Sequence, residues 1–370
     1  MMSIFYARSL FVLLLMVVGA ACEEVGQKPG SGEASVGQEE LQALPGMEVL
    51  ELDSSLQIAE FVVEVYGDKK GHLWFGTMAK GVARYDGEKL TYLDKSQGLG
   101  GNTICSITED QDGNYWFGGH AGATHWDGTN FTHFGPEQGL PGVGCQILVD
   151  REGNVWAGTN AGAFRFDGQA FQPFSLPTPR LDTEDYKWER GKVWCLMQDK
   201  SGNIWFGRDG YGALRFNPDS LTYRHITTKD GLISNNVSQI VEDERGHIWF
   251  GSLTSDFPEY QKVGGLTRYD GENFTTFPEV KGLTENDIYT LYVDGRGDVW
   301  IGAIGIGAYR YDGETFHLYN QTDRPDLNQV FGIQGIWEDE RGRMWFGFSG
   351  GLFRFNGTAF VNVNQYGPWD

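Results

Sequence analysis

The stretch Asp68 to Gly76, D-K-K-G-H-L-W-F-G, is the first of seven copies of one pattern. Each copy keeps Asp-x-x-Gly-x-x-Trp-x-Gly, which we call the frame. Neighbouring copies lie 40 to 51 residues apart, a period typical of stacked supersecondary units. We therefore expect one repeat domain, although 370 residues would otherwise suggest two domains. The seven frame tryptophans are Trp74, Trp116, Trp156, Trp205, Trp249, Trp300 and Trp345.

Each copy divides into four short strands at its turn signals. In the fifth copy, residues 237–242 and 247–251 flank the frame turn, and residues 265–269 and 273–277 flank the hairpin Asp270-Gly271. One four-stranded sheet of this size cannot bury both of its faces, so neighbouring sheets must stack, and seven of them close into a ring. The sequence therefore predicts an all-β fold, a seven-bladed β-propeller of four-stranded antiparallel blades.

The recurrence of the frame indicates that its residues serve the fold. The Asp can accept hydrogen bonds from its own turn, the first Gly supplies a positive φ, and the Trp buries a large ring between blades. Metal binding by the seven Asp is disfavoured, because each lies in a separate turn. The third strand carries Arg in six copies and His125 in the second. A guanidinium packed on an aromatic ring or paired with a turn carboxylate explains this better than an anion site.

The N-terminal region carries targeting signals. Residues 1–21 combine a basic residue, an apolar run and small residues, which is typical of a signal peptide. Cys22 follows Gly-Ala-Ala and resembles the modified Cys of a bacterial lipobox, which implies a lipid anchor; a soluble exported protein is the alternative. Residues 22–46 are rich in Gly, Ser and Glu and predict a flexible tether. We expect the propeller to span 47–370, with 47–52 as the candidate strand that closes the ring.

These signals predict an exported, lipid-anchored protein in the periplasm or on the outer-membrane surface, in contact with the membrane only through its anchor. The formal net charge of −21 argues against nucleic acid as a partner, because a polyanion would be repelled. A neutral or cationic ligand, or a partner protein, is easier to reconcile with this charge.

Three cysteines lie in first strands of neighbouring repeats. Cys105 and Cys145 occupy the same position, and Cys195 lies one residue off. A disulfide between blades is compatible with export, but free thiols are favoured, because equivalent residues on neighbouring inner strands lie too far apart for a bridge. The cysteines have no Cys-x-x-Cys spacing and no His at ligand spacing, so we expect no metal and no cofactor.

A ligand site is expected where the repeats differ. Two insertions, residues 175–192 and 252–263, would emerge on the face formed by second-to-third-strand loops and by connections between blades, which we call the loop face. Aromatic and polar side chains on loops over a rigid scaffold are typical of a binding site; solvated loops without a ligand are the alternative. The candidate ligand-binding residues on the loop face are His120, Asn160, Tyr186, Trp188, Arg208, Asp209, Tyr211, Asp256 and Tyr260.

The repeat unit resembles the two-component regulator propeller repeat. The unit is I-x-x-I-x-E-D-x-x-G-x-I-W-F-G followed by G-G-L-x-R-Y-D-G-x-x-F-x-x-F, and it is matched closely by residues 237–251 and 265–277. The resemblance covers about residues 58–364. It implies a seven-bladed propeller like the periplasmic sensor domains of hybrid histidine kinases, many of which respond to glycans. Because no kinase or DNA-binding segment follows the last repeat, we do not expect signalling by this chain alone.

We therefore expect an extracytoplasmic propeller lipoprotein that binds an oligosaccharide, another ligand or a partner protein, in a sensing or accessory role and without chemistry. The frame is also similar, more weakly, to the sialidase Asp-box and to the repeats of virginiamycin B lyase, a metal-dependent seven-bladed enzyme. That similarity implies a lyase or hydrolase as the alternative. Such a lyase uses His and Glu with Mg²⁺ on the loop face, where His120 is the only histidine expected.

Overall fold

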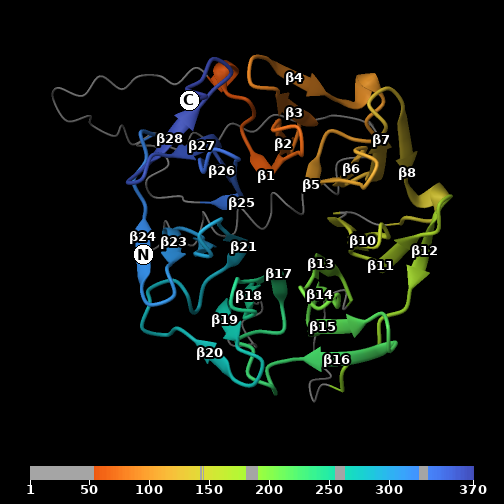
Figure 1. Ribbon diagram of the computed structural model, residues 1–370, viewed down its shortest axis with the longest axis vertical. Coiled ribbons are helices and arrows are strands. Elements are labelled where there is room, and N and C mark those ends of the chain that lie inside the picture. The colour runs from red at the N-terminus through yellow and green to blue at the C-terminus, as the bar shows by residue number, and fades with distance from the viewer. Residues whose placement is uncertain (1–53, 142–143, 145, 181–190, 255–262, 325–331) are drawn as a thin grey trace, which may run out of the picture. The chain divides into compact units, whose positions relative to one another are not determined.

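The computed structural model describes residues 54–141, 144, 146–180, 191–254, 263–324 and 332–370. From Leu56 to Asp370 the chain forms one compact unit. Its strands make seven sheets of four, and every sheet uses four strands that are consecutive in the chain. The sheets are arranged in a ring (Figure 1). The predicted all-β, seven-bladed propeller is therefore confirmed. The predictions for residues 1–21, Cys22, 22–46 and 47–52 lie outside the described residues.

Each blade consists of an inner strand, two middle strands and an outer strand. Blades 1 to 4 contain β1 (Val62–Gly67), β2 (Leu73–Thr77), β3 (Val82–Tyr85), β4 (Leu90–Leu93); β5 (Ile104–Glu109), β6 (Tyr115–Gly119), β7 (Gly122–Trp126), β8 (Phe131–Phe134); β9 (Gln146–Val149), β10 (Val155–Thr159), β11 (Gly162–Phe166), β12 (Phe171–Phe174); and β13 (Val193–Gln198), β14 (Ile204–Arg208), β15 (Gly212–Asn217), β16 (Thr222–Ile226). Blades 5 to 7 contain β17 (Val237–Glu242), β18 (Ile248–Ser252), β19 (Gly265–Tyr269), β20 (Phe274–Thr276); β21 (Ile288–Val293), β22 (Val299–Ala303), β23 (Gly307–Tyr311), β24 (Phe316–Tyr319); and β25 (Ile333–Glu338), β26 (Met344–Phe348), β27 (Gly351–Phe355), β28 (Phe360–Val363).

The four strands predicted for the fifth repeat agree with β17 to β20 to within one residue at each end. Within the described ranges, three short 3-10 helices precede blade 1 or join blades: η1 (Ser54–Leu56), η2 (Lys95–Gln97) and η3 (Pro136–Gln138). In the part of the chain that the structure describes, no helix has the length and apolar character needed to cross a membrane.

The frame turn joins the inner strand of each blade to the second strand. In blade 5, Oδ1 of Asp243 accepts the backbone N–H groups of Arg245 and His247, both at 2.9 Å. Gly246 completes this turn with φ of 81°, a left-handed conformation that favours glycine. Oδ2 of Asp243 accepts the indole N–H of Trp249 at 2.9 Å. One carboxylate therefore holds both the turn and the core ring.

The bond between frame Asp and frame Trp occurs in six blades, at 2.8 to 3.0 Å. The turn bonds of the Asp agree with the prediction from the repeat, whereas the bond to the indole is an additional feature of the structure. Blade 2 is the exception, because the indole nitrogen of Trp116 has no hydrogen-bond partner.

The hydrophobic core is divided into seven clusters, each spanning the contact between two neighbouring blades. Trp74 of blade 1 packs with Ile104 and Phe117 of blade 2, and Trp345 of blade 7 lies in the cluster that includes blade 1. A Cβ on the second frame glycine, Gly76, would lie 2.6 Å from the carbonyl oxygen of Ile104. The predicted roles of the frame Trp and Gly, burial between blades and close approach, are confirmed.

Four of the six third-strand arginines pack on the frame Trp of their blade, as expected. The distance from the guanidinium carbon to the Trp ring centroid is 5.4 to 6.0 Å for Arg84, Arg165, Arg215 and Arg268. Arg310 instead pairs with the turn carboxylate of Asp298 at 3.6 Å. These contacts explain the recurring arginine without an anion site.

Side chains near the two ends of the described chain close the ring between blade 7 and blade 1. Gln57 and Asn362 exchange side-chain hydrogen bonds of 2.8 and 3.1 Å. The indole of Trp369 stacks on the ring of Tyr85 in β3, with centroids 4.0 Å apart and planes 9° from parallel. The carbonyl oxygen of Trp369 accepts a bond from Arg343 at 2.6 Å. The C-terminal segment therefore joins the first and last blades by ring packing and hydrogen bonds, and among the described residues each sheet consists of strands from one repeat.

Cys105 and Cys195 are free thiols, and Cys145 lies outside the described residues. Burial raises the pKa of both thiols to about 12. The preference for free thiols is therefore confirmed for the two cysteines that the structure describes.

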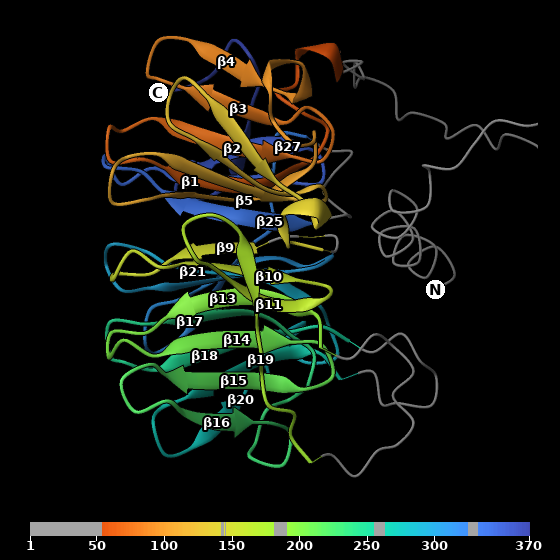
Figure 2. The same ribbon diagram turned by 90° about the vertical axis from the view of Figure 1, so that its right-hand side faces the viewer.

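The alternating strand direction places two kinds of connection on opposite faces of the ring. Figure 2 shows β13 to β16 running across the ring from one face to the other. The frame turns and the third-to-fourth-strand hairpins lie on one face, which we call the turn face. The second-to-third-strand loops and the connections between blades form the loop face.

Candidate functional site

Five of the nine candidate ligand-binding residues are described, and all five follow or end a second strand on the loop face. These residues are His120 after β6, Asn160 after β10, and Arg208, Asp209 and Tyr211 between β14 and β15. The other four candidates, Tyr186, Trp188, Asp256 and Tyr260, lie outside the described residues. The described candidates therefore belong to blades 2 to 4.

The loop between β14 and β15 is held from both sides. The backbone N–H of Asp209 donates to the carbonyl of Lys192 at 2.9 Å, at the start of the same blade. The backbone N–H of Gly210 donates to the side-chain oxygen of Asn236, which precedes blade 5, also at 2.9 Å. Gly210 has a φ of 69°, which lets this short loop turn. The loop therefore presents its side chains from a fixed backbone.

Arg208 is the most unusual residue of this loop. Its side chain is buried, with only 3% of the residue exposed. One guanidinium nitrogen donates to the carbonyl of Pro177 at 2.8 Å, and the guanidinium lies 4.6 Å from the ring centroid of Tyr211. Its Nε–H has no partner, and among the described residues no carboxylate pairs with it. Burial lowers the pKa of Arg208 to about 10, so the group remains protonated at neutral pH.

The other repeats show that the fold does not need this charge. Arg208 directly follows the second frame glycine, and the corresponding residue of every other repeat is uncharged. These residues are Thr77, Gly119, Thr159, Ser252, Ala303 and Phe348. A buried cation at one of seven equivalent positions is the departure expected of a residue that serves a ligand.

A second cation, Lys192, lies on the same side of the ring and was not singled out from the sequence. Its ammonium nitrogen is 3.1 Å from the ring centroid of Trp194 in β13. The indole nitrogen of Trp194 is buried without a hydrogen-bond partner. Burial, and then the charge of Lys192, lower the pKa of His120. A Trp in an inner strand, two residues after a Lys, is the signal by which the sequence could have revealed this pair.

The loop face at blade 4 therefore combines two cations, Arg208 and Lys192, with the aromatic rings of Tyr211 and Trp194. Unpartnered N–H groups on Arg208 and Trp194 are donors that a ligand oxygen would satisfy. Within the described residues, no three side chains of His, Cys, Asp or Glu are grouped as metal ligands. The arrangement suits binding of a ligand rich in oxygen.

The family model for two-component regulator propeller repeats matches four segments of the chain, at residues 98–121, 189–207, 231–254 and 282–305. Among curated proteins, "Histidine kinase P4" of Formosa agariphila is 26% identical over 186 residues. That alignment covers 48% of this chain and 13% of the kinase. The chain thus matches only a small part of that relative's length.

Two kinds of solved structure share the fold. The extracellular domain of a putative hybrid two-component system from B. thetaiotaomicron has a TM-score of 0.63 and 22% identity, over 80% of this chain and 39% of that one. Virginiamycin B lyase from Staphylococcus aureus has a TM-score of 0.59 and 14% identity, over 79% of this chain and 93% of the lyase. At such identities these similarities concern the fold and carry no statement about ligand or reaction.

Proposed function

We propose that this seven-bladed propeller, in which four segments match the two-component regulator propeller model, is an extracytoplasmic binding module in a sensing or accessory role. The proposed site is the loop face over blades 2 to 5, and the proposed ligand is an oligosaccharide. The similarity to an extracellular domain of a putative hybrid two-component system supports a location outside the cytoplasm.

The buried guanidinium of Arg208 is the observation that carries this proposal. A buried cation without a carboxylate partner loses its hydration, and an N–H group left without an acceptor adds a further cost. Third-strand arginines such as Arg84 and Arg268 also have an Nε–H without an acceptor. What distinguishes Arg208 is its burial at a position where the other six repeats carry no charge, and a ligand oxygen would supply its missing acceptor. Hydroxyl or ring oxygens of a sugar would accept from the Arg208 Nε–H, and the ring of Tyr211 beside it offers a surface for stacking.

Calorimetric titration of the full chain against a panel of oligosaccharides tests the proposal. We expect Tyr211→Ala and Trp188→Ala to weaken binding roughly tenfold each, as loss of one stacking ring commonly costs about 1 to 2 kcal/mol. Tyr223→Ala is the matched control, because Tyr223 lies on the outer strand β16 of the same blade and is 39% exposed. Its affinity should equal that of the unchanged protein.

A different outcome is that no glycan gives heat and that the chain captures a partner protein in a manner that depends on Tyr211. The ligand of this site would then be a protein and not an oligosaccharide. Binding that is unaffected by Tyr211→Ala and Trp188→Ala would place the site elsewhere.

The export and lipid anchor predicted from residues 1–21 and Cys22 form part of the same proposal. Metabolic labelling with a fatty-acid analogue tests it in cells that express the full chain. Label should be incorporated by the unchanged chain and be absent from Cys22→Ala. Equal labelling of both chains would contradict lipidation at Cys22.

No arrangement of described residues favours the alternative of a metal-dependent lyase or hydrolase, which rests on His120 and on a shared fold. It predicts turnover that requires a divalent metal and is lost in His120→Ala.

A further inference from the structure

Blade 2 differs from the other blades at its frame Trp. Trp116 faces His125 across β6 and β7, where the corresponding Trp in every other blade faces an Arg. The indole N–H of Trp116 is buried without a partner. The frame carboxylate that would accept it, Asp110, lies 3.3 Å from Nε2 of His125 and accepts from the side chain of Asn114 at 3.3 Å.

The carboxylate of Asp110 is also more open to solvent than its counterparts. Its side chain is 17% exposed, whereas those of Asp68 and Asp294 in blades 1 and 6 are fully buried at 0%. Blade 2 therefore keeps the frame carboxylate but turns it away from the indole. Blade 2 thus has a carboxylate acceptor near the surface and, beside it, a buried N–H donor without an acceptor.

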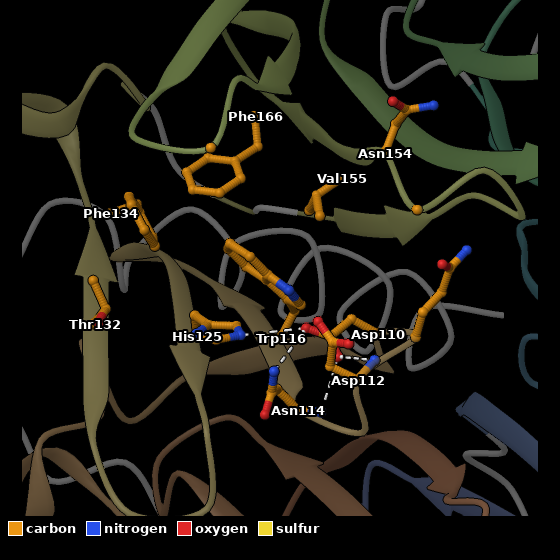
Figure 3. Close-up of a pocket in the computed structure, with 13 residues that line it drawn as sticks. Asp110, Asp112, Asn114, Trp116, His125, Thr132, Phe134, Asn154, Val155 and Phe166 are labelled. Atoms are coloured by element: carbon orange, nitrogen blue, oxygen red, sulfur yellow. Dashed lines mark hydrogen bonds and ion pairs between the residues drawn. The ribbon is translucent and has the colours of Figure 1, made fainter.

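A cavity of about 600 Å³ opens at this place, between blades 2 and 3 on the turn face (Figure 3). Its lining includes two carboxylates, three amide side chains, the ring of His125 and three further aromatic rings. Among these side chains are Asp110, Asp112, Asn114, Trp116, Phe134 and Phe166. Among the described residues, no Lys or Arg lines the cavity; its carboxylates therefore give it a negative charge that would repel an anion.

The neighbouring blade shows how this chain binds a guanidinium in the equivalent place. Arg165 of blade 3 lies 5.4 Å from the ring centroid of Trp156, and one of its terminal nitrogens donates to the side-chain oxygen of Asn154. Asn154 and Asn114 occupy the same position, four residues after their frame Asp. Blade 2 thus retains the ring and the amide that hold a guanidinium, and lacks the guanidinium itself.

We propose that the cavity between blades 2 and 3 binds the guanidinium group of an external ligand, which takes the place of the arginine that blade 2 lacks. The planar cation lies over the face of Trp116, and its N–H groups donate to Asp110 and to the side-chain oxygen of Asn114. Phe134 and Phe166 enclose the apolar part of the ligand.

The unsatisfied indole also fits this occupant. The contact of Asp110 with His125, at 3.3 Å, is at the long end of the hydrogen-bond range. A cation beside Asp110 can displace His125, and the freed oxygen can then accept the Trp116 N–H, as it does in the other six blades. This site lies on the turn face and does not depend on the ligand proposed for the loop face.

Calorimetric titration of the full chain with N-acetylarginine methylamide tests the inference. The citrulline analogue of this probe has the same shape without the charge, and we expect it to bind roughly tenfold more weakly or worse. The side-chain N–H resonance of Trp116, assigned by its loss in Trp116→Phe, should shift on addition of the arginine probe. The affinities of methylguanidine and of a blocked Gly-Arg-Gly peptide show whether a small molecule or a protein segment supplies the guanidinium group. The source is the one whose probe binds more tightly.

Two variants locate the site. His125→Arg restores the residue of the other blades and should fill the cavity, so binding should fall at least tenfold while thermal stability is kept. His317→Arg is the matched control, since it makes the same substitution in the outer strand β24 of blade 6, and its affinity should be unchanged. Asp110→Asn keeps an oxygen for the turn but removes the charge, and should also lose binding at least tenfold.

Equal affinities for the arginine and citrulline probes would overturn the inference, as would unchanged binding in both His125→Arg and Asp110→Asn. Binding of a neutral sugar such as glucose, lost in His125→Arg while the arginine probe gives no heat, would show that the cavity takes a hydroxylated ring instead of a cation.

Discussion

Replacement of Trp369 by Ala should weaken the closure of the ring. The indole of Trp369 is partly buried. Its ring centroid lies 4.0 Å from that of Tyr85 in blade 1 and 6.1 Å from that of Trp345 in blade 7. Burial of about 100 Å² of apolar surface contributes about 2.5 kcal/mol, and the parallel stack on Tyr85 contributes roughly 1 kcal/mol more. The backbone bond from Arg343 to Trp369 remains in the variant. We therefore expect a loss of about 3 kcal/mol in the free energy of unfolding.

Urea unfolding followed by intrinsic fluorescence and by circular dichroism measures this loss, with Tyr366→Ala as the control. Tyr366 belongs to the same C-terminal segment but is 82% exposed, so its replacement should change stability by less than about 0.5 kcal/mol. A loss below about 1 kcal/mol for Trp369→Ala would refute the argument. So would an equal loss in both variants, because the segment would then act without the packing of Trp369 against blade 1.

Two further predictions concern the carboxylates of the frame turns and of β1. Asp243→Ala should lower the free energy of unfolding, measured in urea, by about 3 kcal/mol, because it leaves the indole N–H of Trp249 without an acceptor. Asp110→Ala should lower it by about half as much, since Trp116 has no such bond. Equal losses in the two variants would contradict this reasoning. Burial raises the pKa of Glu64 in β1 to about 8 from an ordinary value of 4.5, so between these pH values the folded state binds a proton that the unfolded state does not. Stability should therefore fall as pH rises from about 5 to about 8, by roughly 1 to 3 kcal/mol after allowance for water around this partly exposed side chain. Glu64→Gln should remove that slope, and parallel pH profiles of the two proteins would exclude Glu64 as its cause.

Much of the candidate site could not be derived from the repeat pattern. The sequence pointed to Arg208, Asp209 and Tyr211 because they depart from the other repeats, and the structure places them together on a fixed loop. Lys192 and Trp194 were missed because neither lies at a frame position. Their contact depends on how the start of β13 approaches the loop face, which no spacing of residues expresses.

The cavity of blade 2 likewise has one feature that the sequence shows and others that only the structure shows. His125 in place of Arg is visible in the sequence, and it was noted there only as an exception. Its consequences depend on side-chain packing between two blades. The indole of Trp116 lacks an acceptor, Asp110 faces outward, and a cavity opens against Phe166 of the next blade.

The sequence by itself determined the fold of this protein, down to the strand bounds of the fifth blade. The signals that decide it are local: a Gly in each turn, an Asp that accepts from its own turn, and a Trp and a Gly two residues apart on one strand. Because the same signals recur in seven repeats, an error in assigning the strands of one repeat does not carry over to the others. Only the tertiary structure decided which atoms close the ring and which N–H groups lack an acceptor. Tyr85 and Trp369 lie at opposite ends of the propeller sequence, and their contact exists only because the first and last blades meet.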